Sequence, residues 1–200
     1  MEELSRAAEH TDITKIIIDE KNSTVFLEDP MMKLDVGAIA KGYAVEMAAR
    51  SLEEKNISGY VINVGGNVRT VGPKGDGSKW LVGIENPEDS DDLPYLAYLE
   101  LSDISLVTSG SYQRYYIVDT KRYHHIIDPQ TLMPSEGYLS VSVICKDSGK
   151  ADALSTALFC MPLDDGLALI NSTDDAEAMW VENDGTIHRS NNFESYLSKQ

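Results

Sequence analysis

The chain has 200 residues, of which 42% are hydrophobic and 25% are charged, so its composition is that of an ordinary globular domain and not of a disordered segment. Its formal net charge is −16 at pH 7. A surface that negative repels phosphate backbones, which excludes a general nucleic-acid binder, and an anionic ligand would need a local cation such as Lys41 or a metal ion.

The first third of the chain predicts a helix, a hairpin and a second helix. We expect a short helix over residues 2–9 and two strands, 13–20 and 23–29, joined by a turn. The stretch GAIAKGYAVEMAARSLEEKN reads as a helix from about Ala38. Its apolar residues at helical spacing predict one buried stripe, which consists of Ala40, Ala44, Met47, Ala48 and Leu52.

The middle and the end of the chain predict mostly strands and hairpins. Strands are expected in YVINVGG, NVRTVG, KWLVGIENP, YLAYLELS and SLVTSGS, followed by a hairpin of residues 112–118 and 122–128. YLSVSVICK is another strand, KADALSTALFCM and DDGLALINS are helices, and a last hairpin precedes a short C-terminal helix. Because hairpins and helices are mixed without regular βαβ alternation, we predict an α+β fold of antiparallel sheets backed by helices.

The two cysteines and the ends of the chain carry little chemistry. Cys145 and Cys160 stand in apolar surroundings without a CxxC pattern, so we expect two buried thiols and neither a disulfide nor a zinc site. No apolar run approaches the length of a transmembrane helix, and no signal peptide is recognisable. The opening residues MEELSRAAEH resemble an interrupted helix, so we expect the chain to be part of a longer protein.

The stretch DVGAIAKG, residues 35–42, places one lysine at a helix start. Gly37 permits a tight turn, and the small side chain of Ala38 leaves the backbone open to close approach. Free N–H groups at a helix start favour an anion, and Lys41 adds a positive charge there. The spacing is not that of a Walker A loop, and by itself the stretch also fits a plain helix start with a surface lysine.

Two further stretches hold polar residues at suggestive positions. In KADALSTAL, Asp152 and Thr156 share one helix face with Ser155 on the adjacent edge, and their oxygens are of the kind that Mg²⁺ accepts. The alternative is an aspartate favoured by the helix dipole and a hydroxyl bonded to its own helix. In RYHHIIDP, neighbouring strand residues face opposite sides, so only one of His124 and His125 can face a site.

Taken together and in order, these stretches resemble the ApbE family, the FAD:protein FMN transferases. The resemblance is carried by LDVGAIAKGYAVE, VINVGGNV, WLVGIENP, LVTSGSYQRYY, YHHIIDPQTLMP and ADALSTALF, from about Ile13 to the last hairpin. It implies an ApbE-like, T-fold-related α+β fold in one domain, residues 1–200, that forms the C-terminal portion of a longer protein.

The resemblance also implies an activity. Relatives would cleave the pyrophosphate of FAD in the presence of Mg²⁺, transfer FMN to a threonine or serine of a target flavoprotein, and release AMP. FAD is then the substrate, Mg²⁺ is the cofactor, and the intact protein is a lipoprotein held outside the cytoplasmic membrane.

Site residues follow from the matching motifs. The resemblance assigns the metal to the backbone carbonyl of Ala38 and to Asp152 and Thr156, together with Ser155. Asp35 and Lys41 would contact the flavin nucleotide, and Leu139 would line the same pocket through its backbone. His125 matches the histidine of the family's H-I-x-D-P motif and would lie near the phosphates as the base that activates the acceptor hydroxyl. The segment 108–110 would shape the pocket floor.

Three positions depart from the family's pattern, and they affect local loop shape. Leu132 replaces a glycine, while Asn67 and Glu46 each replace a common aspartate. Three other functions remain open at this point: an FAD-binding module without transfer, a Mg²⁺-dependent FAD pyrophosphatase with water as acceptor, and a fragment that binds nothing without the rest of the protein.

Overall fold

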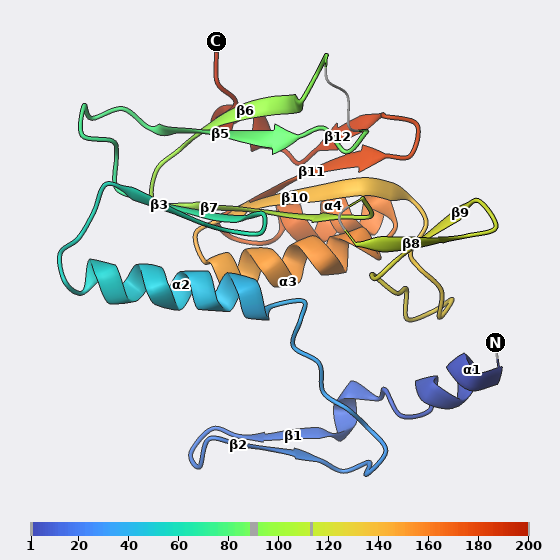
Figure 1. The fold of residues 1–200 in the computed structure, drawn as a ribbon. Helices are drawn as coiled ribbons and strands as arrows, with labels where there is room; N and C mark the ends of the chain where they lie inside the picture. The colour runs from blue at the N-terminus through green and yellow to red at the C-terminus, as the bar shows by residue number, and fades with distance from the viewer. Residues whose placement is uncertain (1, 89–91, 113, 200) are drawn as a thin grey trace.

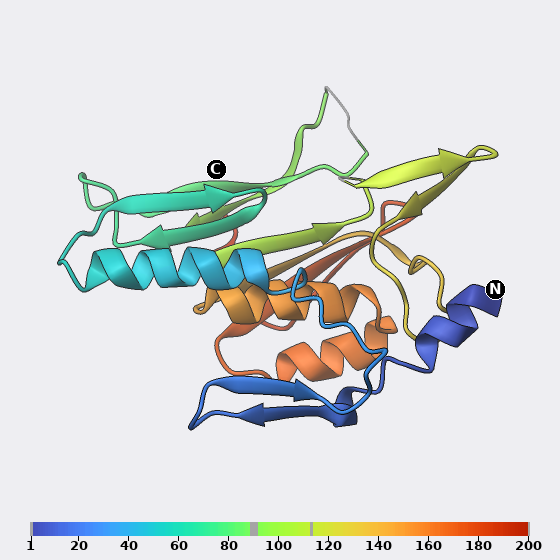
Figure 2. The same ribbon diagram turned by 60° about the horizontal axis from the view of Figure 1, so that its bottom comes forward.

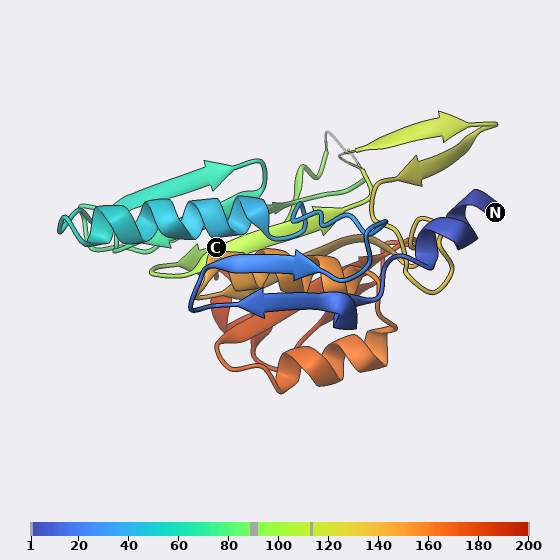
Figure 3. The ribbon, with the colours of Figure 1, turned by 90° about the horizontal axis from the view of Figure 1, so that it is seen from below.

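The computed structural model describes residues 2–88, 92–112 and 114–199. Its N-terminal arm, residues 2–34, contains helix α1 (Glu2–Ala8), a single 3-10 turn η1 (Ile13–Lys15) and the antiparallel hairpin of β1 (Ile16–Asp19) and β2 (Thr24–Leu27). The arm lies on the helical side of the molecule, away from its centre (Figures 1 and 3). The predicted hairpin is confirmed, but its first strand begins only at Ile16.

A six-stranded antiparallel sheet forms the middle of the molecule, in the order β12-β11-β10-β7-β4-β3. Strand β10 lies inside the sheet and is covered on both faces, so apolar side chains of both faces are buried along it. The strands are β3 (Tyr60–Val64), β4 (Asn67–Val71), β7 (Ser105–Gly110), β10 (Tyr138–Cys145), β11 (Ala176–Glu182) and β12 (Ile187–Arg189).

Two further layers cover the sheet (Figures 1 and 2). On one face lie α2 (Ala40–Glu53), α3 (Ser148–Phe159) and α4 (Leu163–Asn171). On the other lie the hairpin of β5 (Trp80–Glu85) and β6 (Tyr95–Leu101) and the 3-10 turn η2 (Phe193–Tyr196). Each interface has its own core, with Phe159 and Trp180 on the helical side and Leu99 and Phe193 on the hairpin side. The predicted α+β class is confirmed.

A third hairpin, β8 (Tyr115–Val118) and β9 (Lys121–His124), projects from one end of the sheet (Figure 1). In the predicted strand 112–118, residue 113 lies outside the described residues. The strand predicted over 122–128 ends at His124. Beyond it, Ile127 forms only an isolated bridge with Pro134, because the chain turns back between these two residues. No helix in the described part of the chain is long and apolar enough to cross a membrane.

The buried face of α2 differs from the predicted stripe. Ala40, Ala44 and Ala48 are exposed, and Met47 and Leu52 are only half-buried. The residues that face the protein are Gly42, Val45, Glu46 and Ala49. Glu46 is buried because it pairs with the guanidinium groups of Arg69 and Arg50, at 3.4 and 3.0 Å, so a charged residue belongs to the inner face.

Both cysteines are free thiols, as predicted. Cys145 is buried, but Cys160 is only partly buried, because it lies at the C-terminal end of α3 beside the segment that follows β9. Burial raises the pKa of both thiols, so both are mostly protonated near neutral pH.

Candidate functional site

Most of the predicted site residues converge on one hollow of about 620 Å³, the main pocket. Six parts of the chain border it: the loop before α2 with the first turn of that helix, the turn between β3 and β4, the end of β7, the segment just before β8, helix α3 and the segment after β9. Of the predicted residues, those that line it are Asp35, Ala38, Lys41, His125, Asp152 and Thr156, together with the floor residues Thr108, Ser109 and Gly110.

The loop before α2 is held in shape by its own aspartate. The Oδ1 atom of Asp35 accepts a hydrogen bond from the backbone N–H of Gly37 at 2.6 Å, which closes a small turn. A side chain at Gly37 would press on that carboxylate, with a Cβ only 2.9 Å from Oδ1. The turn brings Ala38 to the pocket wall, just before α2 begins at Ala40.

Asp152 supplies the buried carboxylate of the main pocket. Helix α3 directs it toward α2, where it is only 2% exposed. Its Oδ2 atom accepts a hydrogen bond from the backbone N–H of Gly42 at 2.8 Å, and Oδ1 lies 3.5 Å from Nζ of Lys41. A buried carboxylate needs such partners, because an uncompensated buried charge is strongly destabilising.

Lys41 lies between a carboxylate and an amide. Its Nζ atom donates to Oδ1 of Asn67 at 3.0 Å, and its side chain is still 39% exposed. Asn67 is fully buried, and its Nδ2 has no hydrogen-bond partner within the described chain. Since Asn67 is neutral, only Asp152 among these two partners offsets the positive charge of Lys41, which leaves Lys41 able to attract an anion.

The two hydroxyls of α3 that were predicted as metal ligands have different surroundings. Thr156 lines the main pocket, with Oγ1 3.4 Å from the carbonyl of Asp152 and 3.3 Å from the Oγ of Ser109. Ser155 is fully buried, donates to the carbonyl of Asp152 at 2.9 Å, and lies 2.8 Å from the same Ser109 Oγ. The structure therefore directs Ser155 toward β7 and leaves it out of the pocket wall, and its assignment to a metal has no support from this geometry.

The adjacent histidines have different surroundings, and of the two only His125 lines the main pocket. His124 is 8% exposed, with Nε2 2.8 Å from the carbonyl of Ser135. His125 is exposed and lines the main pocket, and its Nδ1 lies 3.3 Å from the carbonyl of Arg114. Because a carbonyl oxygen only accepts, this contact places the proton of neutral His125 on Nδ1 and leaves Nε2 free to accept one.

Arg114 is a residue that the sequence analysis missed. It lines the main pocket from the segment just before β8, so a second cation shares the hollow with Lys41. Its position in SYQRYY resembles any surface arginine, and only the packing of the β8–β9 hairpin against the pocket reveals it. The basic residue immediately before YYIV was the one available signal.

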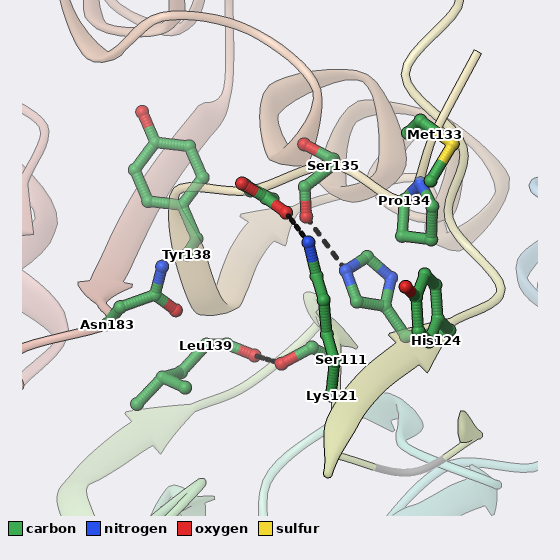
Figure 4. Close-up of a pocket in the computed structure, with 11 residues that line it drawn as sticks. Ser111, Lys121, His124, Met133, Pro134, Ser135, Tyr138, Leu139 and Asn183 are labelled. Carbon is green, nitrogen blue, oxygen red and sulfur yellow. Dashed lines mark hydrogen bonds and ion pairs between the residues drawn. The ribbon is translucent and has the colours of Figure 1, made fainter. Parts of the chain in front are cut away.

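Leu139 lies outside the main pocket and lines a smaller neighbouring hollow of about 160 Å³, shown in Figure 4. Its carbonyl oxygen accepts hydrogen bonds from the backbone N–H and the hydroxyl of Ser111, at 3.0 and 3.3 Å. In the same hollow, Lys121 pairs with Glu136 at 2.7 Å. Leu139 thus borders a region next to the main pocket, and its carbonyl is already hydrogen-bonded to Ser111, the residue that follows β7.

A metal in the main pocket would need mixed oxygen ligands. No group of three or more His, Cys, Asp or Glu that could hold a metal occurs in the described chain. One buried carboxylate, Asp152, one hydroxyl, Thr156, and Ala38, whose carbonyl is the predicted ligand, line the same hollow. This donor chemistry suits a hard cation such as Mg²⁺, which keeps part of its water shell and shares oxygen ligands with a phosphate substrate.

Leu132, which stands where the resemblance implies a glycine, has a backbone conformation that glycine adopts easily. Leu132 has φ = 57°, in the left-handed region that bulky residues rarely adopt. Its backbone N–H donates to the carbonyl of Asp128 at 2.8 Å and closes the turn after the His125 segment. Leucine at this position therefore keeps the shape of the loop, but its left-handed backbone conformation costs free energy that a glycine would not lose.

Comparison with known proteins identifies many relatives. The model of the ApbE family matches residues 1–180. The FAD:protein FMN transferase of Klebsiella pneumoniae is 38% identical over 84% of this chain and 51% of its own length. That of Vibrio cholerae is 33% identical over 99% of this chain and 59% of its own length. The chain therefore spans about half of the length of these curated relatives.

Solved structures share the fold. The ApbE protein of Thermotoga maritima is 36% identical with a TM-score of 0.89, and the match covers 99% of this chain and 64% of that one. The flavin transferase ApbE of Vibrio cholerae is 30% identical with a TM-score of 0.82, over 98% of this chain and 62% of that one. With the motif residues gathered in one pocket and both sequence and fold matched almost throughout, the chain belongs to the ApbE family.

Proposed function

We propose that the protein of which this chain is part transfers FMN from FAD to a threonine or serine of a target flavoprotein and releases AMP. The observation that carries the proposal is the convergence of two cations, a histidine with a free Nε2 and a buried carboxylate on the main pocket. The names of the relatives, FAD:protein FMN transferase, support the same reaction.

The residues of the main pocket have separate tasks in this reaction. Lys41 and Arg114 hold the negatively charged pyrophosphate in a chain that otherwise repels it. His125 accepts the proton of the acceptor hydroxyl at Nε2, and the acceptor oxygen then attacks the FMN phosphorus. The P–O bond to the bridging oxygen breaks, and that oxygen leaves with AMP, so the acceptor keeps FMN through a phosphoester bond.

Mg²⁺ would be held by the Ala38 carbonyl, Asp152 and Thr156, and when bound it polarises the phosphoryl oxygens and offsets charge on the leaving group. Lys41 lies beside Asp152 and keeps that carboxylate paired when no cation is bound. Thr156 keeps its hydroxyl at the pocket wall through contacts with α3 and β7.

The experiment that tests the proposal compares AMP release by the intact protein with and without an acceptor. Incubation with FAD, Mg²⁺ and proteins of the source cell should leave flavin fluorescence on one denatured band, and mass spectrometry should locate FMN on its threonine or serine. AMP should then form in equal amount to labelled acceptor. AMP release that is equally fast without acceptor would instead indicate an FAD pyrophosphatase, and tight binding of FAD without AMP would indicate a binding module.

Two variants of one residue separate metal binding from folding. Asp152→Asn keeps an oxygen for the Gly42 N–H but loses the charge, so Mg²⁺-dependent binding of FAD should weaken while unfolding changes little. Asp152→Ala also leaves that buried N–H unpaired, which should cost about 1–3 kcal/mol of stability. Calorimetric titration of FAD with Mg²⁺ and then with EDTA measures the first effect, and urea unfolding measures the second. Full Mg²⁺ dependence in Asp152→Asn would contradict the metal assignment.

A further inference from the structure

A third hollow, of about 520 Å³, adjoins the main pocket and is called the side groove. Gly65 and Thr108 line both hollows, so an occupant of the side groove that reaches this end would meet the main pocket. No lysine, arginine or histidine is among the described residues that line the side groove, and Glu85 adds a negative charge. A pyrophosphate is therefore disfavoured there, in contrast to the main pocket.

The aromatic walls of the side groove are fixed in place by glycines. A Cβ at Gly83 would collide with the ring of Tyr95, and a Cβ at Gly110 would collide with the ring of Tyr112. Both rings thus lie directly against the backbone, and both line the groove. On the same wall, Nε1 of Trp80 donates to the carbonyl of Gly72 at 2.8 Å, which fixes the indole. Such preformed aromatic surfaces bind partners at a low entropic cost.

One wall of the groove is the edge of a strand. Four consecutive residues of β5, 80–83, line it. Successive strand residues point to opposite faces, so a run of four shows that the strand's edge, and not one face, borders the hollow. In the part of the chain that the structure describes, β5 pairs with β6 alone, so its other edge carries backbone N–H and C=O groups that are open to an added strand.

We propose that the side groove docks the acceptor protein through an extended segment that runs along β5, with its hydroxyl residue at the Gly65 end beside the main pocket. The inference rests on the proposed function, because a transfer reaction must bring the hydroxyl of an acceptor protein to the main pocket. The occupant is an uncharged segment with apolar residues around the hydroxyl, because the described lining is largely apolar and aromatic and contains no cation. Acidic neighbours would be repelled by Glu85 and by a chain of net charge −16.

The test uses the intact protein, FAD, Mg²⁺ and the acceptor that the wild-type protein flavinylates. Leu81 and Val61 line the groove from β5 and from β3 and are 46% and 37% exposed, so Leu81→Arg and Val61→Arg place a bulky charge in the groove from two elements without disturbing a core. We expect each to raise the KM for the acceptor by about tenfold or more. The kcat at saturating acceptor and the Kd for FAD should stay within about twofold of the wild-type values.

The matched control is Ile57→Arg. Ile57 is 45% exposed and lines neither hollow, so the same substitution should leave the acceptor KM unchanged. An unchanged acceptor KM in both groove variants would overturn the inference, and so would a weaker affinity for FAD, which would assign the groove to the nucleotide. If the wild-type protein labels no acceptor at all, that result contradicts the proposed function itself, and the inference about the side groove is then overturned as well.

Discussion

At the scale of single residues, the main pocket depends on Gly42, where any side chain would collide with helix α3. Gly42 stands where α2 crosses α3, and a Cβ there would lie 2.6 Å from the Cβ of Asp152 and still closer to the carbonyl of Ser148. The glycine therefore allows its own N–H to reach the Asp152 carboxylate. It also lets the two helices that carry Lys41 and Asp152 approach closely enough for these residues to pair.

We predict that Gly42→Ala destabilises the chain, because the clash involves backbone atoms of α3 that cannot move without shifting the helix. The expected loss is about 1–3 kcal/mol, seen as a lower urea midpoint with an unchanged slope. Gly137→Ala is the control, since a Cβ there meets no heavy atom within 4 Å. Equal midpoints for the two variants would show that the helices separate freely at Gly42.

At the scale of elements, the sequence predicted helix α2 but not its inner face. Apolar spacing favoured Ala44 and Ala48, whereas the buried positions include Gly42 and Glu46, which a hydrophobicity pattern does not count. Glu46 is buried through ion pairs that reach Arg69 on β4, and Gly42 through close approach to α3. Both causes are contacts between distant parts of the chain, which local periodicity does not contain.

The same division applies to the site. Asp152 and Thr156 could be predicted, because four residues on a helix bring side chains to one face. Ser155 and Thr156 are about 100° apart around the helix axis, so the pocket accepts one while β7 takes the other. Arg114 could not be predicted, because its place in the main pocket depends on how the β8–β9 hairpin packs.

The segment that carries His125 is held in position by the contacts of the preceding residue, His124. The Nε2–H of His124 donates to the carbonyl of Ser135, and Nδ1 accepts from the N–H of Ile126 at 3.3 Å. The ring also meets Phe159 edge-on, with centroids 5.6 Å apart. His124 is thus a positioning residue for His125, whose Nε2 must reach the acceptor hydroxyl.

We predict that His124→Phe lowers the kcat for flavin transfer by about 10–100-fold, because a shift of about 1 Å in a reacting group has effects of that size. The aromatic contact is retained, so the Kd for FAD should stay close to the wild-type value. Steady-state kinetics on the intact protein, with FAD titration alongside, measures both. His188→Phe, on β12 far along the sheet from β7, is the control and should retain full activity. An unaltered kcat in His124→Phe would remove the positioning role.

In the N-terminal arm, the end of α1 is tied to the chain after β2 by His10 and Asp29, whose Nδ1 and Oδ2 atoms are 2.7 Å apart. This hydrogen bond, with a second from the N–H of Met31, lowers the pKa of Asp29 below its ordinary value of 3.8. A lowered carboxyl pKa contributes stability that is complete above pH 3.8 and is lost as the pH falls through the lowered value.

His10→Ala should therefore raise the pKa of Asp29 toward 3.8. The stability that the ionised Asp29 gives to the arm should then be lost at a higher pH than in the wild-type chain. A carbon-detected NMR titration of the Asp29 carboxyl group measures this midpoint directly. Asp12, whose pKa is lowered by hydrogen bonds from Thr14, should keep its midpoint in the same variant. An Asp29 midpoint that does not move would mean that the contact with His10 is not formed in solution.

At the scale of the whole molecule, the three layers and the N-terminal arm are energetically distinct. Both cores are built from side chains that follow α2 in the sequence, from β4 to η2. The arm exposes apolar side chains on both faces of its hairpin, with Ile18 at 67% and Phe26 at 63%. The layers hold the main pocket together, whereas the arm adds apolar surface that the described residues leave uncovered.

We predict that deletion of residues 2–30 leaves the thermal unfolding of the layers almost unchanged, with a shift in Tm below about 2 °C, which corresponds to less than about 1 kcal/mol. Met32, which is buried, is retained in this variant. Binding of the dye ANS should fall, because the deleted hairpin carries exposed apolar surface. Calorimetry and dye fluorescence on the 200-residue chain measure the two effects. Phe193→Ala, in the core under β6, should lower stability by about 3–5 kcal/mol in the same assay. A comparable loss on deleting the arm would show that the arm packs on the layers in solution, because only buried apolar contact produces a change of that size.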